Sequence, residues 1–390
     1  MAAHSSTDAP HRTDTVVIGA GPAGLAVAAC LQREGVPFVV LERAEAVGAR
    51  WRTHYDRLHL HTDKKRSALP FLPFPDTAPT YPSRQQVVDY LEAYAGHFGV
   101  APRFGEEVEV VRRAGEEWET VTSRGRYRSR CVVVATGYSN EPREPTWPGR
   151  GAFGGTVLHS AAYRNGEPFR GQAVLVVGIG NSGAEIALDL AEHGAHPTLA
   201  FRTPTNVVPR DILGVPLLAI SRLSMKLPPT WADRLNAPLL RLIFGDLTRY
   251  GFPKPPYGPM EQTSRYRRVP LIDVGTIAAI KRGAIAVKHA DVERFTEDGV
   301  VFSDGTARAF DAVVLATGYR PAVGAFVDEE EALSDGAPRV DGAEPAMPRL
   351  YFCGYTVSPG GMLNVIQSQA PAIAEAVAAE RRQDMVPSGS

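Results

Sequence analysis

Two glycine-rich stretches carry the clearest chemical signal in this sequence of 390 residues. Each has three glycines in the spacing GxGxxG, at 19–24 and again at 178–183. In both, an apolar strand-like run precedes the glycines and a helical run follows, which is the context that the motif requires. The first glycine permits a tight turn, the second lets a pyrophosphate approach the backbone, and the third lets helix and strand pack closely. The N–H groups at the start of the helix attract the anion. The sequence therefore predicts two dinucleotide sites.

The first site is expected between a strand over 15–18 and a helix that ends near Arg33. A second strand, over 38–41, runs into Glu42, and an acid about twenty residues past the glycines is where a ribose 2′-hydroxyl is bound. The alternative is a chance glycine turn in an ordinary βαβ unit. The predicted contacts of this site are Gly19, Gly21, Pro22, Ala23, Gly24, Glu42 and Arg43.

The second site differs at the residue that follows its second strand. A strand over 198–201 ends in Arg202 and Thr203 rather than in an acid. A carboxylate would repel a 2′-phosphate, whereas a guanidinium binds one with two parallel hydrogen bonds. NADP is therefore preferred over NAD, unless Arg202 is only a solvated residue at a strand end; Arg210 is a weaker second candidate for the phosphate. The predicted contacts are Gly178, Gly180, Asn181, Ser182, Gly183, Arg202 and Thr203.

A further duplication follows each glycine turn. Apolar strands run into Ala-Thr-Gly-Tyr at 135–138 and at 316–319. This repeat resembles the flavoproteins with two dinucleotide-binding domains. The resemblance implies an α/β fold with two Rossmann-like domains, for FAD and NADPH, the second inserted into the first. It also adds four cofactor-binding residues, Thr136, Gly137, Thr317 and Gly318.

The same resemblance sets the expected domain limits. FAD would be bound by residues 13–165 and 321–380, and NADPH by residues 166–320 with a helical insertion at about 213–252. Residues 1–12 and 381–390 are expected to be disordered tails.

The stretch FGGTVLHSAAYR, residues 153–164, is too polar for a core strand and too rich in glycine for a helix. Its residues Phe153, Gly155, His159 and Tyr163 fit the pattern FxGxxxHxxxY, which resembles the fingerprint of the flavin-containing (class B) monooxygenases. The resemblance places the stretch at the crossing between the two domains. Either His159 contacts a cofactor, or it hydrogen-bonds the backbone while the two aromatic residues pack the hinge.

Other stretches resemble one branch of that family, the YUCCA-type indole-3-pyruvate monooxygenases. They include YDRLHLH at 55–61, YPSRQQVVDYLEAYA at 81–95 and VPRDILG at 208–214, and the resemblance spans about 15–321. The sequence departs from that pattern at 62–65 and at 351–369, so the substrate does not transfer safely. An NADPH- and O2-dependent monooxygenase acting through a C4a-(hydro)peroxyflavin is implied, with oxidative decarboxylation of a 2-oxo acid such as indole-3-pyruvate.

Alternative functions remain open. They are Baeyer–Villiger oxidation or N- or S-oxygenation of a small molecule and, in another class, an NADPH-dependent flavoprotein reductase, an electron-transfer protein or a redox sensor.

No catalytic residue is assigned from the sequence, because the cofactor supplies the hard chemistry. The resemblance places Arg50 in a turn beside the flavin, and makes Trp51, His61, Asp63 and Asn364 the flavin-proximal candidates. Trp51 is equally compatible with a core position. A helix from about 365 to 380 would point its N-terminus at the flavin, and the capping box of Ser83 and Gln86 predicts a helix over 85–97.

Composition limits the partners. Hydrophobic residues make up 44% of the chain, charged residues 22%, and the net charge is −1, which indicates a globular protein with no nucleic-acid partner. The three cysteines form no CxxC pair and no metal site, and no signal peptide is evident. We therefore expect a cytoplasmic enzyme that acts on a small-molecule substrate and O2. The apolar window 16–31 holds glycines and Pro22, which makes a membrane span improbable. The insertion could cover the active site, pair subunits as a homodimer or touch a membrane; a helical lid is favoured.

Overall fold

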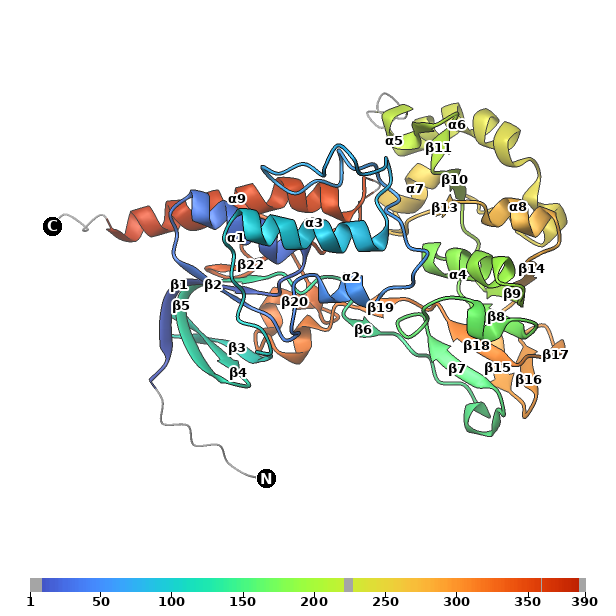
Figure 1. The fold of residues 1–390 in the computed structure, drawn as a ribbon, viewed down its shortest axis with the longest axis horizontal. Helices are drawn as coiled ribbons and strands as arrows, with labels where there is room; N and C mark the ends of the chain where they lie inside the picture. The colour runs from blue at the N-terminus through green and yellow to red at the C-terminus, as the bar shows by residue number, and fades with distance from the viewer. Residues whose placement is uncertain (1–8, 221–226, 359, 386–390) are drawn as a thin grey trace.

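The computed structural model describes residues 9–220, 227–358 and 360–385, which form two lobes that each contain a large sheet (Figure 1). The first sheet has the order β2–β1–β5–β4–β3, and β22 pairs along the second half of β5. Its strands are β1 (His11–Ile18), β2 (Phe38–Leu41), β3 (Val108–Ala114), β4 (Glu117–Thr122), β5 (Gly125–Val134) and β22 (Leu350–Phe352). β1, β2, β5 and β22 are parallel, whereas β3, β4 and β5 form an antiparallel meander. A strand near the C-terminus thus completes the sheet that the N-terminal strand begins.

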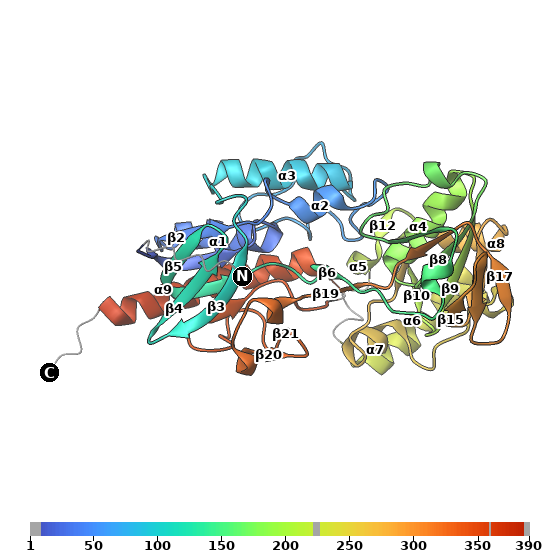
Figure 2. The ribbon, with the colours of Figure 1, turned by 90° about the horizontal axis from the view of Figure 1, so that it is seen from below.

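The second sheet is wholly parallel, in the order β14–β9–β8–β18–β7. Its strands are β7 (Thr156–His159), β8 (Ala173–Val177), β9 (His196–Phe201), β14 (Ala286–His289) and β18 (Ala312–Leu315). A small antiparallel sheet packs on one face, made of β15 (Val292–Phe295), β16 (Gly299–Phe302) and β17 (Ala307–Ala309). Between the lobes, β6 (Glu141–Pro142) pairs with β19 (Tyr319–Arg320), so the outgoing and returning chains cross side by side (Figure 2).

Within the stretch 153–164, which is too polar for a core strand, Thr156–His159 forms the edge strand β7. Val157 packs into the core on the β15–β17 side, and Leu158 packs against the opposite core. Successive side chains of a strand point to opposite faces, so two apolar residues are enough to fix this short strand between both cores. An edge position also tolerates the polar residues that surround them.

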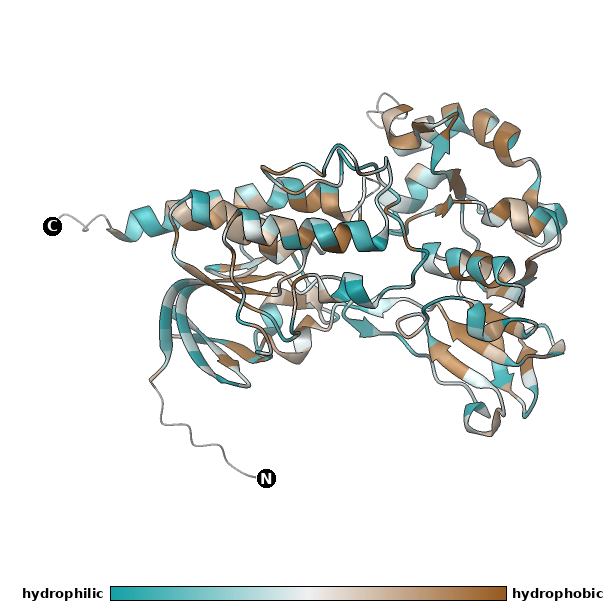
Figure 3. Cartoon of the chain, viewed as in Figure 1, coloured by the Kyte–Doolittle hydropathy of each residue, from teal (hydrophilic) through white to brown (hydrophobic). Residues whose placement is uncertain are grey.

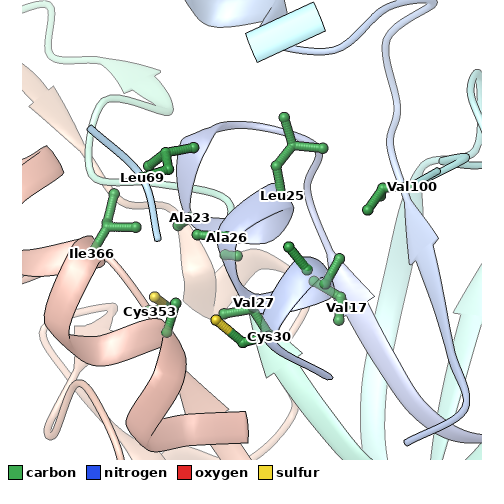
Figure 4. Close-up of a cluster of buried hydrophobic side chains, with 14 of the residues drawn as sticks. Val17, Ala23, Leu25, Ala26, Val27, Cys30, Leu69, Val100, Cys353 and Ile366 are labelled. Atoms are coloured by element: carbon green, nitrogen blue, oxygen red, sulfur yellow. The ribbon is translucent and has the colours of Figure 1, made fainter. Parts of the chain in front are cut away.

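Helices cover one face of the first sheet: α1 (Pro22–Arg33), α3 (Arg84–His97) and α9 (Met362–Met385). α1 is buried from Ala23 to Leu31, because the sheet lies on one side of it and the other helices on the other. Figure 4 shows this packing, with Ala26 and Cys30 of α1 beside Val17 of β1 and with Cys353 and Ile366 close by. Small side chains along α1 allow the helix and strand to approach closely, as the glycine motif requires.

In the second lobe, α4 (Asn181–Glu192) and α8 (Thr276–Lys281) cover the sheet opposite β15–β17. The segment predicted as a helical insertion contains α5 (Leu217–Ile220), α6 (Pro229–Phe244) and the short helix η4 (Leu247–Tyr250), with residues 221–226 outside the described chain. α6 exposes Trp231, Leu235 and Leu242, the last by 83%. Much of this helix has the brown colour of hydrophobic residues in Figure 3.

The remaining elements are short. They are α2 (Ala49–Thr53), α7 (Pro259–Ser264), the pairs β10 (Val207–Pro209) with β13 (Leu271–Asp273), β11 (Asp211–Ile212) with β12 (Val215–Pro216) and β20 (Leu333–Ser334) with β21 (Ala337–Pro338), and the 3-10 turns η1 (Arg150–Ala152), η2 (Glu167–Phe169), η5 (Val323–Ala325) and η6 (Glu330–Ala332).

Predicted boundaries shift by a few residues. α3 begins one residue earlier than predicted, and the capping box between Ser83 and Gln86 is confirmed. β1 takes in His11 and Arg12 of the predicted N-terminal tail, and α9 extends from Met362 to Met385, into the predicted C-terminal tail. Both extensions are held by tertiary pairing, which local composition does not reveal. Among the described helices, none combines the length and apolarity needed to cross a membrane.

Candidate active site

The first glycine turn has the geometry that the motif predicts. Gly19 has φ +105°, and a Cβ on it would lie 2.8 Å from the carbonyl oxygen of Ala135. A Cβ on Gly24 would lie 1.8 Å from the carbonyl oxygen of Gly19, so the third glycine permits α1 to pack on the turn. Gly21 instead faces open space at the start of α1. A ligand, rather than neighbouring protein, is therefore the reason for a glycine at position 21.

A cavity of about 450 Å³ opens at this turn, a size typical of small-molecule sites. The ends of β1, β2 and β5 border it together with α2 and the N-terminal turn of α9. The predicted residues that line it are Gly19, Gly21, Pro22, Ala23, Glu42, Arg43, Arg50, Trp51, Thr136 and Gly137. Sequence reasoning missed His54, Asn140, Gly354, Met362, Leu363 and Ile366, which reach the cavity from distant segments.

Glu42 is fixed at the end of β2. Its Oε2 accepts a hydrogen bond from the Ala20 N–H at 2.7 Å, and its Oε1 accepts one from the Ala44 N–H at 2.9 Å. Each carboxylate oxygen can accept a further hydrogen bond, which suits the hydroxyls of a ribose. Next to it, Arg43 donates to the side chain of Asn140 at 2.7 Å, so the rim of the cavity is also ordered.

Arg50, on α2, has buried donor atoms that lack a partner. Its Nε and Nη2 have no hydrogen-bond acceptor among the described residues, while its guanidinium lies 4.5 Å from the ring centroid of Tyr319. Buried polar groups are normally hydrogen-bonded, and a guanidinium is well suited to a phosphate. The open space at Gly21, the acid at Glu42 and the unpartnered Arg50 therefore fit an FAD molecule along this cavity.

His54 is a neutral histidine at the same cavity. Burial, and after it the charges of Arg50, Arg84 and Arg164, together lower its pKa from 6.5 to about 4. The ring of Trp51 meets it edge-on at 5.9 Å. At neutral pH, His54 can thus donate and accept hydrogen bonds without adding charge.

The flavin-proximal candidates lie in different places. Of the four, Trp51 alone borders the first cavity, and it also packs against the core around α1. The carboxylate of Asp63 is engaged by the guanidinium and the N–H of Arg66. Asn364 lies in the first turn of α9 beside Gly360, and His61 turns towards the second lobe.

The second glycine turn repeats the geometry of the first. Gly178 has φ +119°, and a Cβ on it would lie 2.3 Å from the carbonyl oxygen of Ala316. A Cβ on Gly183 would lie 2.0 Å from the carbonyl oxygen of Gly178, whereas Gly180 again faces open space. α4 starts at Asn181, whose Oδ1 accepts the N–H of Ile272 at 2.9 Å. In both turns, therefore, the first and third glycines allow close packing, and the second leaves room for a ligand.

Arg202 directly follows β9 and is 70% exposed at its side chain. Its Nη1 lies 3.3 Å from Oδ2 of Asp291, and Thr203 beside it is exposed too. An exposed ion pair contributes little, so a phosphate can displace Asp291 at small cost. The position at the strand end is compatible with the predicted 2′-phosphate contact.

The fingerprint residues of 153–164 hold the second lobe together. His159 accepts the Ala161 N–H at Nδ1 and lies 3.1 Å from the Gly318 carbonyl oxygen at Nε2. Tyr163 donates to Asp189 at 2.6 Å, and a Cβ on Gly155 would lie 2.4 Å from the carbonyl oxygen of Asp311. Burial lowers the pKa of His159. Both ring nitrogens of His159 thus have backbone partners, as the backbone hydrogen-bonding alternative predicts.

A second polar cluster joins the two lobes. His61 Nε2 lies 2.5 Å from Oε1 of Glu185, which is buried on α4. The buried phenol of Tyr55 hydrogen-bonds Ser182 and Glu185; burial first, and then the charge of Glu185, raise the pKa of Tyr55 well above its ordinary value. Sequence reasoning missed Glu185, because it sits on a helix face that is otherwise apolar. In the sequence, the closely spaced His59 and His61 were the feature that could have indicated this polar cluster.

Comparisons with known proteins identify the fold. A family model described as "Pyridine nucleotide-disulphide oxidoreductase" matches residues 16–211. The chain superposes on a flavin-containing monooxygenase from Stenotrophomonas maltophilia with a TM-score of 0.74 and 26% identity, covering 95% of this chain and 99% of the other. NADP+-bound cyclohexanone monooxygenase from Rhodococcus sp. Phi1 superposes with a TM-score of 0.74 at 22% identity, over 96% of this chain and 85% of the other, which shows a common fold. The fold is thus the mixed α/β fold of the flavin monooxygenases.

A sequence relative defines the branch. Indole-3-pyruvate monooxygenase YUCCA1 of Oryza sativa subsp. japonica is 44% identical over 319 residues, covering 80% of this chain and 78% of the rice protein. The chain belongs to the YUCCA-type family of flavin monooxygenases, which confirms the resemblance found in the sequence. It is an NADPH- and O2-dependent flavin monooxygenase with FAD and NADPH as cofactors.

Proposed function

We propose that this enzyme converts a 2-oxo acid such as indole-3-pyruvate into the carboxylic acid that is one carbon shorter. The overall reaction is 2-oxo acid + O2 + NADPH + H+ → carboxylic acid + CO2 + NADP+ + H2O. The observation that carries the proposal is the 44% identity to a rice enzyme named for indole-3-pyruvate. The motifs around the second polar cluster and at 208–214, which adjoin the candidate site, also resemble that branch.

We infer that FAD is bound by residues 13–165 and 321–380, and NADPH by residues 166–320 inserted between them. Two observations support this division. β22 returns to pair with β5 in the first sheet, and the chain crosses between the lobes at β6 and β19. The two open glycine positions, Gly21 and Gly180, lie one in each proposed domain.

The residues of the chain bind and orient the cofactors. When bound, the flavin accepts hydride from NADPH and activates oxygen, which is chemistry that no side chain provides. Glu42 would hold the ribose and the free N–H groups of α1 the pyrophosphate, with Arg50 as a cationic partner. The N-terminus of α9, at Met362, borders the cavity and favours negative charge beside it by about 0.3–1 kcal/mol when exposed and up to about 2 kcal/mol when partly buried.

The buried side chains also limit water at the site. Trp51, Leu363 and Ile366 provide apolar walls to the first cavity. His54 stays neutral there, so it can hold a proton for a hydrogen bond without attracting water as a cation would. Exclusion of water protects reactive intermediates from side reactions.

The reductase alternative is less well supported. A thiol reductase needs a reactive, accessible cysteine. Cys30, Cys131 and Cys353 are unpaired and buried, and burial raises the pKa of each. Baeyer–Villiger and N- or S-oxygenation remain the alternative reactions for the same cofactors.

Reaction stoichiometry tests the proposal. The yellow holoenzyme would be supplied with NADPH, air and either indole-3-pyruvate, an uncharged ketone or an amine. We expect one CO2 and one carboxylic acid per NADPH with the 2-oxo acid, and mainly peroxide release with the other two. Coupled turnover with the ketone or amine, and none with any 2-oxo acid, would overturn the proposed substrate class.

A further inference from the structure

A second cavity, of about 640 Å³, lies between the lobes. The loop at 57–61 and the segment 79–81 form one side of it, and residues of the second lobe form the other. Its polar residues are Arg57, His59, His61, Thr80, Tyr81, Glu185, Arg210 and Asp211. The volume is in the range of sites for small organic ligands.

Two short connections place this cavity next to the first one. Thr62 follows His61, and its Cγ2 would lie 2.8 Å from a Cβ on Gly361, which immediately precedes α9. His54 lines the first cavity, and its neighbour Tyr55 hydrogen-bonds Glu185, which lines the second. A ligand in the second cavity would therefore lie close to the end of the first cavity that α9 borders.

Arg210 lies at this cavity, and its buried Nε is in an ion pair but has no hydrogen bond among the described residues. Its guanidinium carbon lies 4.2 Å from the ring centroid of Tyr81, and the Tyr81 hydroxyl donates to the Arg210 carbonyl oxygen at 3.3 Å. Asp211 is 3.5 Å from its Nε as an ion pair, yet this buried Nε has no hydrogen-bond partner among the described residues.

The other charged groups of the cavity wall are already engaged. Arg57 pairs with Glu192, and His61 pairs with Glu185. Asp211, the remaining acid of the wall, lies 3.5 Å from the Nε of Arg210. Among the described residues that line this cavity, Arg210 is thus the cation with an unsatisfied buried donor. An unpaired buried donor costs about 1–3 kcal/mol. We therefore expect a ligand to provide the hydrogen-bond acceptor that this group lacks.

We propose that Arg210 binds the carboxylate of the substrate in this cavity and so selects 2-oxo acids over uncharged carbonyl compounds and amines. The assignment rests on the proposed function for the identity of the acid. A guanidinium and a carboxylate match in a planar, two-bond geometry, and the ring of Tyr81 fixes the plane of the guanidinium. A cationic amine would meet a like charge here. Arg210 acts as a specificity-determining residue and takes no part in bond making.

The competing role for Arg210 is a contact with the NADPH 2′-phosphate. The two roles differ in which ligand loses affinity when the guanidinium is removed. Binding should therefore be measured for both ligands on the same variant. Indole-3-pyruvate and its methyl ester are a matched pair of probes, because they differ in the charge of the carboxyl group.

The test measures dissociation constants of both probes on oxidised, FAD-loaded enzyme with NADP+ present. Native enzyme should bind the acid about 10- to 100-fold more tightly than the ester, the effect expected of a charge-assisted pair. Arg210→Met should abolish this preference and leave NADP+ affinity unchanged, and Arg210→Lys should restore part of it. Arg57→Met, which removes a positive charge from the same wall, should preserve the preference for the acid.

Flavin absorbance and thermal unfolding would verify that each variant is folded. An unchanged acid preference in folded Arg210→Met, or a loss confined to NADP+ binding, would overturn the assignment. Because binding is measured without turnover, a native enzyme that prefers the acid but forms no product would contradict the proposed function and leave the assignment of Arg210 standing.

Discussion

His61 and Glu185 form a direct contact between the two lobes, with Nε2 and Oε1 2.5 Å apart. The side chain of Glu185 is only 4% exposed, and Tyr55 is its other hydrogen-bonding partner. The contact joins the segment that follows α2 to the first turns of α4, which carries the second glycine motif. The pair therefore fixes how the two candidate cofactor sites face each other.

A double-mutant cycle should measure this contact. We expect Glu185→Gln and His61→Gln each to lower the free energy of unfolding, His61→Gln by about 1–3 kcal/mol because it removes a hydrogen-bond partner from a buried side chain. In the double variant, the loss should be smaller than the sum by at least about 1 kcal/mol. Urea denaturation of the FAD-loaded proteins provides the values, and strictly additive losses would show that the two side chains do not interact.

The glycines of each motif should separate into two kinds. Gly21→Ala should give a folded but colourless protein, because its methyl group would occupy the space of a pyrophosphate rather than strike the protein. Gly24→Ala should instead prevent proper folding of the turn, since its Cβ would lie 1.8 Å from a carbonyl oxygen. Circular dichroism and the ratio of flavin to protein distinguish the two results. A fully yellow Gly21→Ala protein would contradict the placement of FAD.

Arg202 should discriminate between the nicotinamide cofactors. We expect Arg202→Ala to raise KM for NADPH about 10- to 100-fold, since a charge-assisted phosphate contact is lost, with little effect on NADH. Arg282→Ala, at another exposed arginine of the second lobe, is the matched control and should change neither value. Steady-state kinetics with both cofactors would test this, and equal effects on NADPH and NADH would remove Arg202 from the phosphate site.

His54 should make the free energy of unfolding depend on pH. Its pKa is about 4 in the folded protein against an ordinary 6.5, so between these values the unfolded chain binds more protons than the folded one. Stability therefore falls as the pH drops through this window, by about 2 kcal/mol from this group between pH 7 and 5. His54→Gln lacks this contribution. Urea denaturation at pH 7 and pH 5 should show a larger loss of stability for the native protein than for His54→Gln. An equal loss in the two proteins would show that His54 is not responsible.

The sequence predicted the features that depend on neighbours along the chain. The two glycine turns, the strand at 38–41 and the capped helix α3 all arise from local patterns, and they appear in the structure. Extended positions such as His11–Arg12 were missed because β1 is held by pairing with β5, more than a hundred residues away.

The candidate site was less predictable for the same physical reason. Arg50 could be placed in a turn, but its missing hydrogen-bond partner becomes visible only when the surrounding segments are assembled. Glu185 and Arg210 approach the segment that follows α2 from the second lobe, across more than a hundred residues of sequence. For His159, the pattern left both cofactor contact and backbone hydrogen bonding open, and the fold supplies backbone partners for both ring nitrogens.

Oxygen-isotope labelling tests the central claim most directly. The holoenzyme would turn over indole-3-pyruvate with NADPH under 18O2, and mass spectrometry would be used on the carboxylic acid product. A monooxygenase that decarboxylates this acid should place one 18O atom in the new carboxyl group, with one NADPH used per product. An unlabelled product, or NADPH oxidation that yields only peroxide across the 2-oxo acids, would contradict the account.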